Sequence, residues 1–83
     1  MLSAKQLESY ITQHLPCDYI QVLGDDGTHF EATIVSPSFV GKGMVAQHQL
    51  VYASLGERMK AEIHALSMQT FTPAAWTKKN SSI

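Results

Sequence analysis

The sequence has few of the residues that would support several common functions. Its 83 residues include one cysteine, Cys17, which excludes an internal disulfide. The sequence contains six basic and seven acidic residues. Its net charge of −1 argues against a general phosphate-binding surface, which normally has a basic excess. No apolar run is long enough to cross a bilayer, and residues 1–3 lack the basic start of a secretory signal. We therefore expect one folded domain in a reducing cytoplasm, with no membrane segment.

Catalytic signatures are also missing. The chain has no nucleophile elbow, paired-carboxylate site, P-loop or Cys-x-x-Cys motif, so we expect a binding protein and not an enzyme. Cys17 follows Pro16 and has no nearby cation to activate its thiol. We interpret Cys17 as a small, mostly buried apolar residue, with a ligand or redox thiol as the alternative.

The pattern of residues 4–14 predicts an amphipathic helix. Ser3 and Gln6 have the spacing of a capping box, and Pro16 ends the helix because the residue before a proline is biased away from helical geometry. Apolar residues recur at helical spacing along one side of this segment: Leu7, Tyr10, Ile11 and Leu15.

Two strands are predicted next, over Asp18–Leu23 and His29–Ser36. Both segments alternate between apolar and polar residues, which is typical of a strand with one buried face. The polar turn Gly24–Gly27 favours a hairpin between them. The residues predicted to face the core are Ile20 and Val22 on the first strand, and Phe30, Ala32 and Ile34 on the second.

A connector and a second helix follow. Residues 36–43 are rich in glycine, serine and proline, with Phe39 and Val40 as two predicted apolar contacts to the core. The helix is expected over residues 45–61, and Gly56 weakens it by about 1 kcal/mol relative to alanine, which favours a break or bend there. Its predicted inward residues are Leu50, Val51, Leu55 and Met59.

Residues 62–76 predict a third strand followed by a short helix. Leu66 and Met68 alternate with Ser67 and Gln69. Thr72–Pro73 is typical of a helix start, with threonine as N-cap and proline in the first turn, and Trp76, one turn later, is expected to fold back over the sheet. We expect one domain over residues 1–77 and a flexible tail over 78–83. The fold class is α+β: a two-layer sandwich in αββαβα order, with helices on one face of a three-stranded sheet.

Two of the four histidines are candidates for chemistry, and the other two are interpreted as structural or neutral. Neutral imidazole is a common metal ligand, and His64 and His29 both stand at predicted strand ends. Two histidines do not fill a coordination sphere, so a partner, a thiol or water would have to complete it. The alternative is that both are structural residues. His48 is predicted to face solvent, and His14 to close the first helix, where a cation suits the helix dipole.

The Gly41–Lys42–Gly43 turn is a candidate phosphate site. It precedes the second helix, whose N-terminal N–H groups could face an anion. The turn is one residue shorter than a Gly-x-x-Gly clamp and has one basic side chain, so a plain connector is the alternative.

Several blocks of the sequence together resemble the BolA family, in particular its short bacterial members of the IbaG type. The blocks are Thr28-His29-Phe30-Glu31 with Val35-Ser36, Phe39-x-Gly41, His48-Gln49-Leu50-Val51-Tyr52, and Ile63-His64-Ala65-Leu66 with Phe71-Thr72-Pro73 and Trp76. The resemblance spans nearly the whole chain. It implies a fold related to class II KH domains, in agreement with the predicted element order.

The resemblance also implies a function. BolA-like proteins pair with monothiol glutaredoxins and share a [2Fe–2S] cluster, to which glutaredoxin cysteine and glutathione supply the other ligands. The resemblance assigns His64 as the main ligand and His29 as the second. The isolated chain is therefore expected to carry no cofactor, and we expect it to be a monomer or weak homodimer. The docking rim would include the Gly24–Gly27 loop, residues 39–43 and the start of the second helix.

BolA itself is linked to transcriptional control of stress and morphology genes, which gives the alternative function. DNA would contact the KH-like surface, here Phe39, Gly41, Lys42, Gly43 and His48. This chain has Gln47-His48-Gln49 where BolA proteins carry Arg-His-Arg. The loss of two phosphate-binding charges lowers the expected affinity for DNA.

Overall fold

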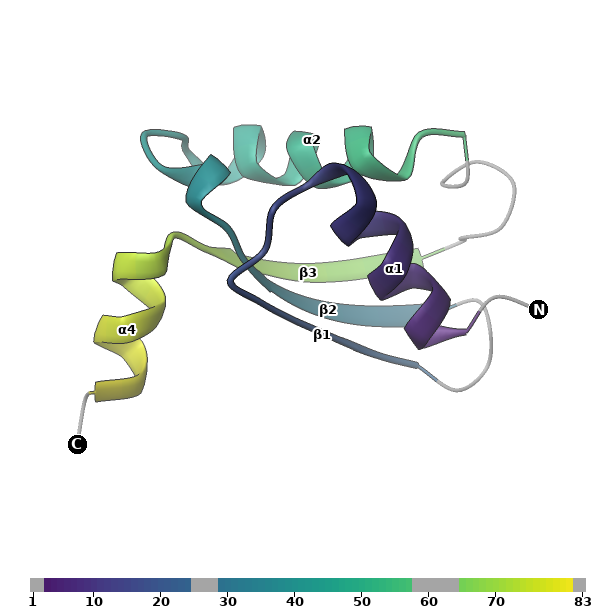
Figure 1. Ribbon diagram of the computed structural model, residues 1–83, viewed down its shortest axis with the longest axis horizontal. Coiled ribbons are helices and arrows are strands. Elements are labelled where there is room, and N and C mark those ends of the chain that lie inside the picture. The colour runs from purple at the N-terminus through teal and green to yellow at the C-terminus, as the bar shows by residue number, and fades with distance from the viewer. Residues whose placement is uncertain (1–2, 25–28, 58–64, 82–83) are drawn as a thin grey trace.

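The computed structural model describes residues 3–24, 29–57 and 65–81. In chain order these form four helical and three strand elements, labelled in Figure 1: α1 (Ala4–His14), β1 (Tyr19–Leu23), β2 (His29–Val35), the 3₁₀ helix η1 (Pro37–Phe39), α2 (Met44–Leu55), β3 (Ala65–Phe71) and α4 (Pro73–Ser81). The predicted αββαβα order is confirmed, with η1 as an unpredicted short element between β2 and α2.

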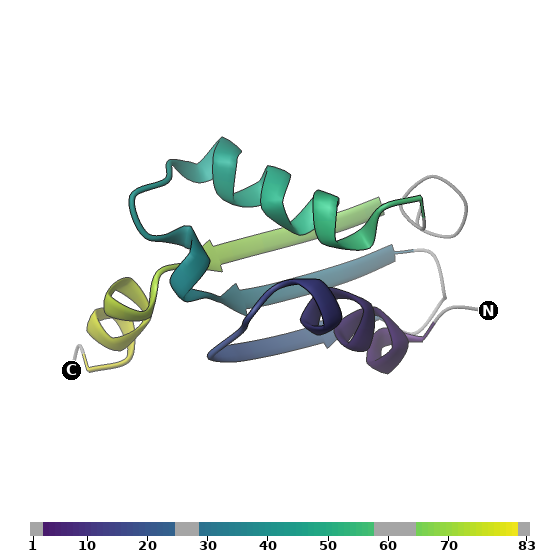
Figure 2. The ribbon, with the colours of Figure 1, turned by 45° about the horizontal axis from the view of Figure 1, so that its top comes forward.

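The three strands form one mixed sheet in the order β1-β2-β3. β1 runs antiparallel to β2, with Ile20 opposite Ile34, whereas β2 and β3 are parallel over their full seven-residue lengths. The parallel pair needs a crossover, which the segment containing η1 and α2 provides. α1 and α2 lie over the same face of the sheet, as Figures 1 and 2 show.

The hydrophobic core lies between that face and the two helices. The predicted alternation of β2 is confirmed, since Phe30, Ala32 and Ile34 are buried while His29 and Glu31 are exposed. The buried cluster contains Leu7, Ile11, Leu15, Val22, Phe30, Ala32, Ile34, Phe39, Val51 and Leu55.

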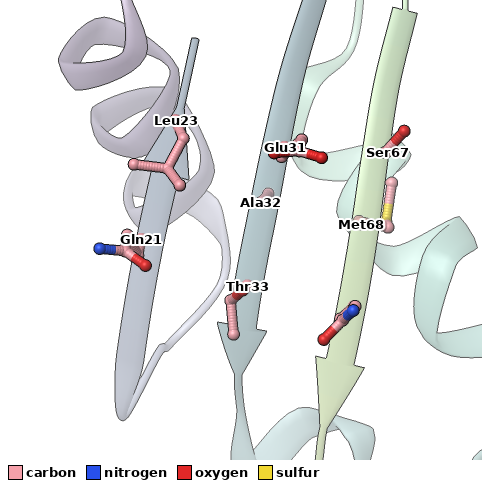
Figure 3. Close-up of a pocket in the computed structure, with 8 residues that line it drawn as sticks. Gln21, Leu23, Glu31, Ala32, Thr33, Ser67 and Met68 are labelled. Atoms are coloured by element: carbon pink, nitrogen blue, oxygen red, sulfur yellow. The ribbon is translucent and has the colours of Figure 1, made fainter.

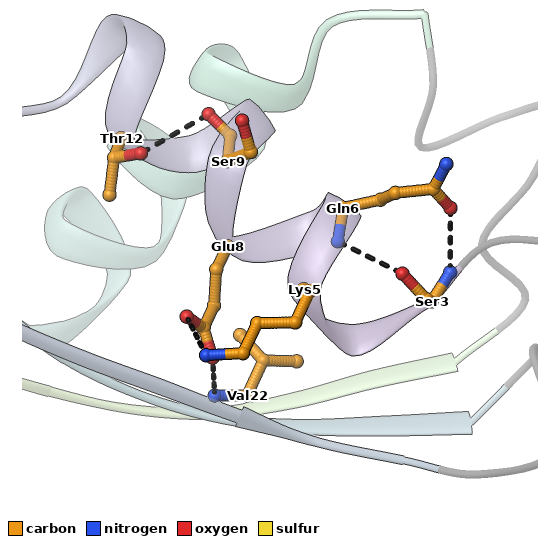
Figure 4. Close-up of polar contacts among 7 residues, drawn as sticks. All are labelled: Ser3, Lys5, Gln6, Glu8, Ser9, Thr12 and Val22. Carbon is orange, nitrogen blue, oxygen red and sulfur yellow. Dashed lines mark hydrogen bonds and ion pairs between the residues drawn. The ribbon is translucent and has the colours of Figure 1, made fainter.

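The predicted capping box is present and stabilises the N-terminus of α1 (Figure 4). The Gln6 N–H donates to Ser3 Oγ over 3.1 Å, and the Ser3 N–H donates to Gln6 Oε1 over 2.9 Å. Glu8 Oε2 accepts the Val22 N–H over 3.1 Å, which joins the helix to β1. Lys5 pairs with Glu8 over 3.8 Å, but its side chain is 91% exposed, so this ion pair adds little stability.

The connector differs from the prediction at one of its two apolar residues. Phe39 is fully buried, but Val40 is 64% exposed, so the predicted core contact of Val40 is wrong. Neighbouring residues in η1 point in different directions, and Val40 stands at its end, where its N–H donates back to the Pro37 carbonyl. The turn therefore directs Phe39 inward and Val40 to the surface.

The end of α2 coincides with the predicted break. The helix ends at Leu55, because Gly56 takes a positive φ of 60° that favours glycine and stops the helix. The predicted break at Gly56 is therefore confirmed, while the predicted helix end at residue 61, and Met59 with it, lie outside the described residues. Val51 and Leu55 are buried as predicted, and Leu50 is half-buried.

α4 begins as predicted and continues further. The Ala75 N–H donates to Thr72 Oγ1 over 3.1 Å, which confirms the N-cap. The helix runs to Ser81, past the predicted domain boundary at residue 77. The placement of helices on one face is confirmed for α1 and α2. Trp76 of α4 instead stacks on Tyr19, which alternates with the core-facing Ile20 and so lies on the other face.

Within the described ranges, no helix combines the length and the apolar character that a membrane crossing requires.

Replacing Phe39 by alanine is expected to destabilise the fold by about 3–5 kcal/mol, because it leaves a cavity in the core. Replacing the exposed neighbour Val40 by alanine should change stability by about 0.5 kcal/mol or less. Urea unfolding followed by far-UV circular dichroism measures both. Similar losses for the two variants would contradict the placement of this pair.

Replacing Gly24 by alanine is expected to destabilise the protein by about 1–3 kcal/mol. A Cβ there would lie 2.6 Å from the His29 carbonyl oxygen and 2.6 Å from Phe30 Cδ1, so the start of β2 would have to move. Gly43→Ala is the matched control, since a Cβ at Gly43 meets nothing within 4 Å and its φ is −73°. Equal urea midpoints for the two variants would show that the close approach at Gly24 has no energetic effect.

Candidate functional site

The first predicted ligand, His29, lies at the start of β2 with its side chain exposed. The parallel register pairs His29 with Ala65, the first residue of β3. Neighbouring strands lie about 4.8 Å apart. His64 itself lies outside the described residues, and one peptide bond joins it to Ala65. The register therefore places His29 beside the residue that follows His64 in the sequence.

The local packing fixes this end of β2. Phe30 is 2% exposed and packs into the core. Gly24, which follows β1, lies close to the Phe30 ring and to the His29 carbonyl, so the end of β1 packs against the start of β2. Because side chains alternate along a strand, the burial of Phe30 turns His29 toward the face that α1 and α2 leave uncovered. The sequence predicted the strand, the core-facing position of Phe30, and the place of His29 at the start of the strand.

The sheet face opposite α1 and α2, which we call the helix-free face because neither of these two helices covers it, carries an open cavity of about 290 Å³ (Figure 3). Sequence reasoning assigned several of its residues to the outward side of single strands, but it did not identify a shared surface, because only the register between strands brings them together. The lining residues are Gln21, Leu23, Glu31, Ala32, Thr33, Ser67, Met68 and Gln69.

Metal-ligating side chains are sparse in the described ranges. Over residues 3–24, 29–57 and 65–81, no three His, Cys, Asp or Glu side chains are grouped closely enough to hold a metal ion.

Cys17 is half-buried, and its Sγ donates to the Leu15 carbonyl over 3.3 Å. Burial raises the pKa of the Cys17 thiol, and the negative charge of Asp18 raises it further. Cys17 is therefore a poor nucleophile near neutral pH. It packs against the core, as the sequence predicts for a small apolar residue.

The five residues predicted to contact a partner or nucleic acid do not lie near His29. They belong to the connector and to the first half of α2, which stand at the opposite end of the sheet, where β2 finishes (Figure 1). β2 has seven residues, and so the two ends are about 20 Å apart. Of the predicted docking rim, residues 25–27 lie outside the described residues, while Gly24 and residues 39–43 lie at opposite ends of the sheet.

Two of these five residues are not fully exposed. Phe39 is fully buried, as its predicted core contact requires, so its side chain is not on the surface that a partner would touch. His48, predicted to face solvent, is half-buried. The turn itself is exposed: Gly41 has φ +79°, the Lys42 carbonyl accepts from Gln47 Nε2 over 2.8 Å, and Gly43 caps α2 without a side-chain bond.

His48 lines a groove of about 370 Å³ between α2 and β3. A short hydrogen bond holds the two walls together, since Thr70 Oγ1 donates to Gln47 Oε1 over 2.6 Å. The other lining residues are Met44, Met68, Gln69 and Phe71.

An apolar patch adjoins this groove at the start of α2. Val40, Met44 and Val45 are 64%, 71% and 71% exposed, and we refer to them as the α2 apolar patch. None of the twelve residues of α2 is charged, which is unusual for a helix with an exposed side. Exposed apolar groups of this kind mark contact surfaces. The absence of charge from residues 44–55 was the signal that sequence reasoning missed.

Comparison with known proteins agrees with this architecture. The family model described as "BolA-like protein" matches residues 6–75. Protein BOLA2 of Arabidopsis thaliana is 39% identical over 80 residues, which cover 92% of this chain and 85% of that protein. SufE-like protein 1 of the same plant is 50% identical over 52 residues, covering 61% of this chain and 14% of that protein. The DNA-binding transcriptional regulator BolA of Haemophilus influenzae is 38% identical over 56 residues, covering 68% and 54%. The chain thus spans most of BOLA2, about half of the Haemophilus influenzae protein and a small part of SufE-like protein 1.

Solved structures extend the likeness to three dimensions. A bol-like protein from Babesia bovis matches with a TM-score of 0.85 and 34% identity, covering 96% of this chain and 95% of that one. The BolA domain of SufE1 from Arabidopsis thaliana matches with a TM-score of 0.76 and 32% identity, covering 89% and 98%. Because the family model covers most of the chain and the mixed sheet with its helices matches these structures, the chain belongs to the BolA-like protein family.

Proposed function

We propose that this chain is a non-catalytic iron–sulfur adaptor that pairs with a monothiol glutaredoxin and co-ligates a shared [2Fe–2S] cluster. The observation that carries the proposal is the parallel register of β2 and β3, which sets His29 beside Ala65, the neighbour of His64. Membership of the BolA-like family supports the same assignment.

The donor set fits such a cluster. The imidazole of His29 is exposed at a strand end, where a second protein has access to it. His64 would supply the second nitrogen, and the cysteine of the glutaredoxin with the thiol of glutathione would supply two sulfurs. Histidine ligation in place of thiolate raises the reduction potential of a [2Fe–2S] cluster.

The partner is expected to dock at the end of the sheet that contains His29. The Gly41–Gly43 turn and the α2 apolar patch lie at the other end, too far away to border the same cluster. Substitutions in the turn should therefore leave cluster sharing intact, whereas substitutions of the two histidines should not.

Co-reconstitution with a monothiol glutaredoxin, iron, sulfide and glutathione tests the assignment. Visible circular dichroism should report a spectrum of the pair that differs from that of the glutaredoxin alone. His64→Ala should remove this spectrum, and His29→Ala should speed cluster loss about tenfold or more, because each removes a nitrogen donor.

His14→Ala is the matched control for these variants, since His14 is an exposed histidine at the end of α1. It should leave both the spectrum and the rate of cluster loss unchanged. The assignment of His64 fails if His64→Ala retains the cluster with the wild-type spectrum.

DNA binding is the second candidate function. It is favoured by the name of the Haemophilus influenzae relative, a DNA-binding transcriptional regulator, and by the groove beside the Gly41–Gly43 turn. The charge pattern supports it less. Lys42 is the basic side chain of the turn, and α2 brings no charge to the groove wall.

A gel-shift titration with duplex DNA at low salt tests this candidate. If the turn binds phosphate, Lys42→Ala should weaken binding to all sequences about equally and reduce the salt slope by about 1. Lys5→Ala, which removes an exposed lysine of α1, is the charge-matched control. Absence of any shift at low salt would count against DNA binding by this chain.

A further inference from the structure

α4 occupies a different position from α1 and α2. α1 and α2 cover the core face of the sheet, whereas α4 stands beyond the ends of β2 and β3 (Figures 1 and 2). Tyr19, Val35 and Phe71 are aligned across the three strands at this end. Their side chains share the helix-free face, since each is one residue away from a core-facing position.

Aromatic contacts hold α4 against that face. The ring of Trp76 stacks on Tyr19, with 5.1 Å between centroids and 18° between planes, and lies 5.2 Å from the ring of Phe71 in a tilted arrangement. Lys79 Nζ lies 5.9 Å from the centroid of Phe71, which adds a weak cation–π contact. Trp76 thus makes both of these ring contacts between α4 and the sheet.

The remainder of α4 contributes little to the body of the domain. It has no buried residue, whereas α1 buries Leu7 and Ile11 and α2 buries Val51 and Leu55. Within the described residues, the hydrogen bonds of α4 stay inside 72–81: the Trp76 N–H donates to the Thr72 carbonyl, the Ala75 N–H to Thr72 Oγ1, and Ser81 Oγ to the Lys78 carbonyl.

The junction between β3 and α4 is a single residue, Thr72. The bond that ties the end of β3 to the body, from the Ser36 N–H to the Phe71 carbonyl over 3.1 Å, lies before this junction. Separation of α4 would therefore break the aromatic contacts and leave the hydrogen bonds of the sheet intact. A nine-residue helix is too short to persist alone in water, so α4 depends on the stack.

We propose that α4 is a detachable cap on the helix-free face, which opens as a unit at Thr72 while the sheet, α1 and α2 stay folded. Opening uncovers the rings of Tyr19 and Phe71. It also enlarges the accessible part of the face that carries Gln21, Thr33 and Gln69. These three residues are the nearest ones to Tyr19, Val35 and Phe71 on the same face of each strand. The cap closes the end of the sheet opposite to His29, so the proposal does not depend on cluster binding.

Hydrogen exchange of the full chain, read by mass spectrometry, separates the cap from the body. Backbone amides of 76–81 should exchange at least about tenfold faster than those of β2, because local opening exposes them without global unfolding. Tyr19→Ala removes the stacked ring and should speed exchange in 76–81 by a further factor of about 2–10, with β2 unchanged.

Tyr52→Ala is the matched control, since Tyr52 and Tyr19 are 40% and 39% exposed and Tyr52 lies on α2. It should leave exchange in 76–81 at the wild-type rate. The sequence has one tryptophan, so iodide quenching of Trp76 fluorescence gives a second readout, which should increase in Tyr19→Ala and not in Tyr52→Ala.

Equal protection of 76–81 and β2 in the wild-type chain would overturn the proposal, because α4 would then open only with the whole domain. An equal acceleration of both segments by Tyr19→Ala would overturn it as well, since that substitution would then act on the fold and not on the cap. Either result leaves the assignment of His64 and His29 untouched.

Discussion

The parallel pairing of β2 with β3 is the constraint on which the rest of the molecule depends. Two parallel strands begin at the same end, so the chain must return across the domain between them, and η1 and α2 make this return. The same register puts His29 beside Ala65 at one end and aligns Val35 with Phe71 at the other. One set of backbone hydrogen bonds thus determines both the candidate ligand site and the surface that α4 covers.

The division of the sheet into two faces follows from the core. α1 and α2 contribute Leu7, Ile11, Val51 and Leu55 to one face, and this burial provides most of the hydrophobic stabilisation. Strand alternation then leaves polar residues such as Gln21, Thr33 and Gln69 on the other face, where no equivalent helix layer is required. α4 covers one end of that face through the ring of Trp76 and a weak contact from Lys79, and it buries no residue of its own.

The two ends of the domain have different chemistry, which bears on the two functions considered for this BolA-like chain. The end with His29 offers an exposed imidazole next to the strand that follows His64. The other end offers the uncharged helix α2 with its exposed apolar patch, Lys42 in the turn, and Lys78 and Lys79 on α4. An adaptor that shares a metal cluster would use the first end, and a DNA-binding protein the second. Because α2 adds no positive charge beside the turn, phosphate binding there has the weaker physical support.

The sequence by itself determined the local elements. The capping box at Ser3, the alternation around Phe30, the glycine stop at Gly56 and the Thr72 cap depend on neighbouring residues, so periodicity and capping chemistry were enough to predict them. Tertiary structure decided what depends on contacts between distant segments: the exposure of Val40, the partial burial of His48, the separation of the Gly41–Gly43 turn from His29, and the face on which Trp76 packs. No spacing within one segment encodes these features, because each arises from the register and packing of elements far apart in the chain.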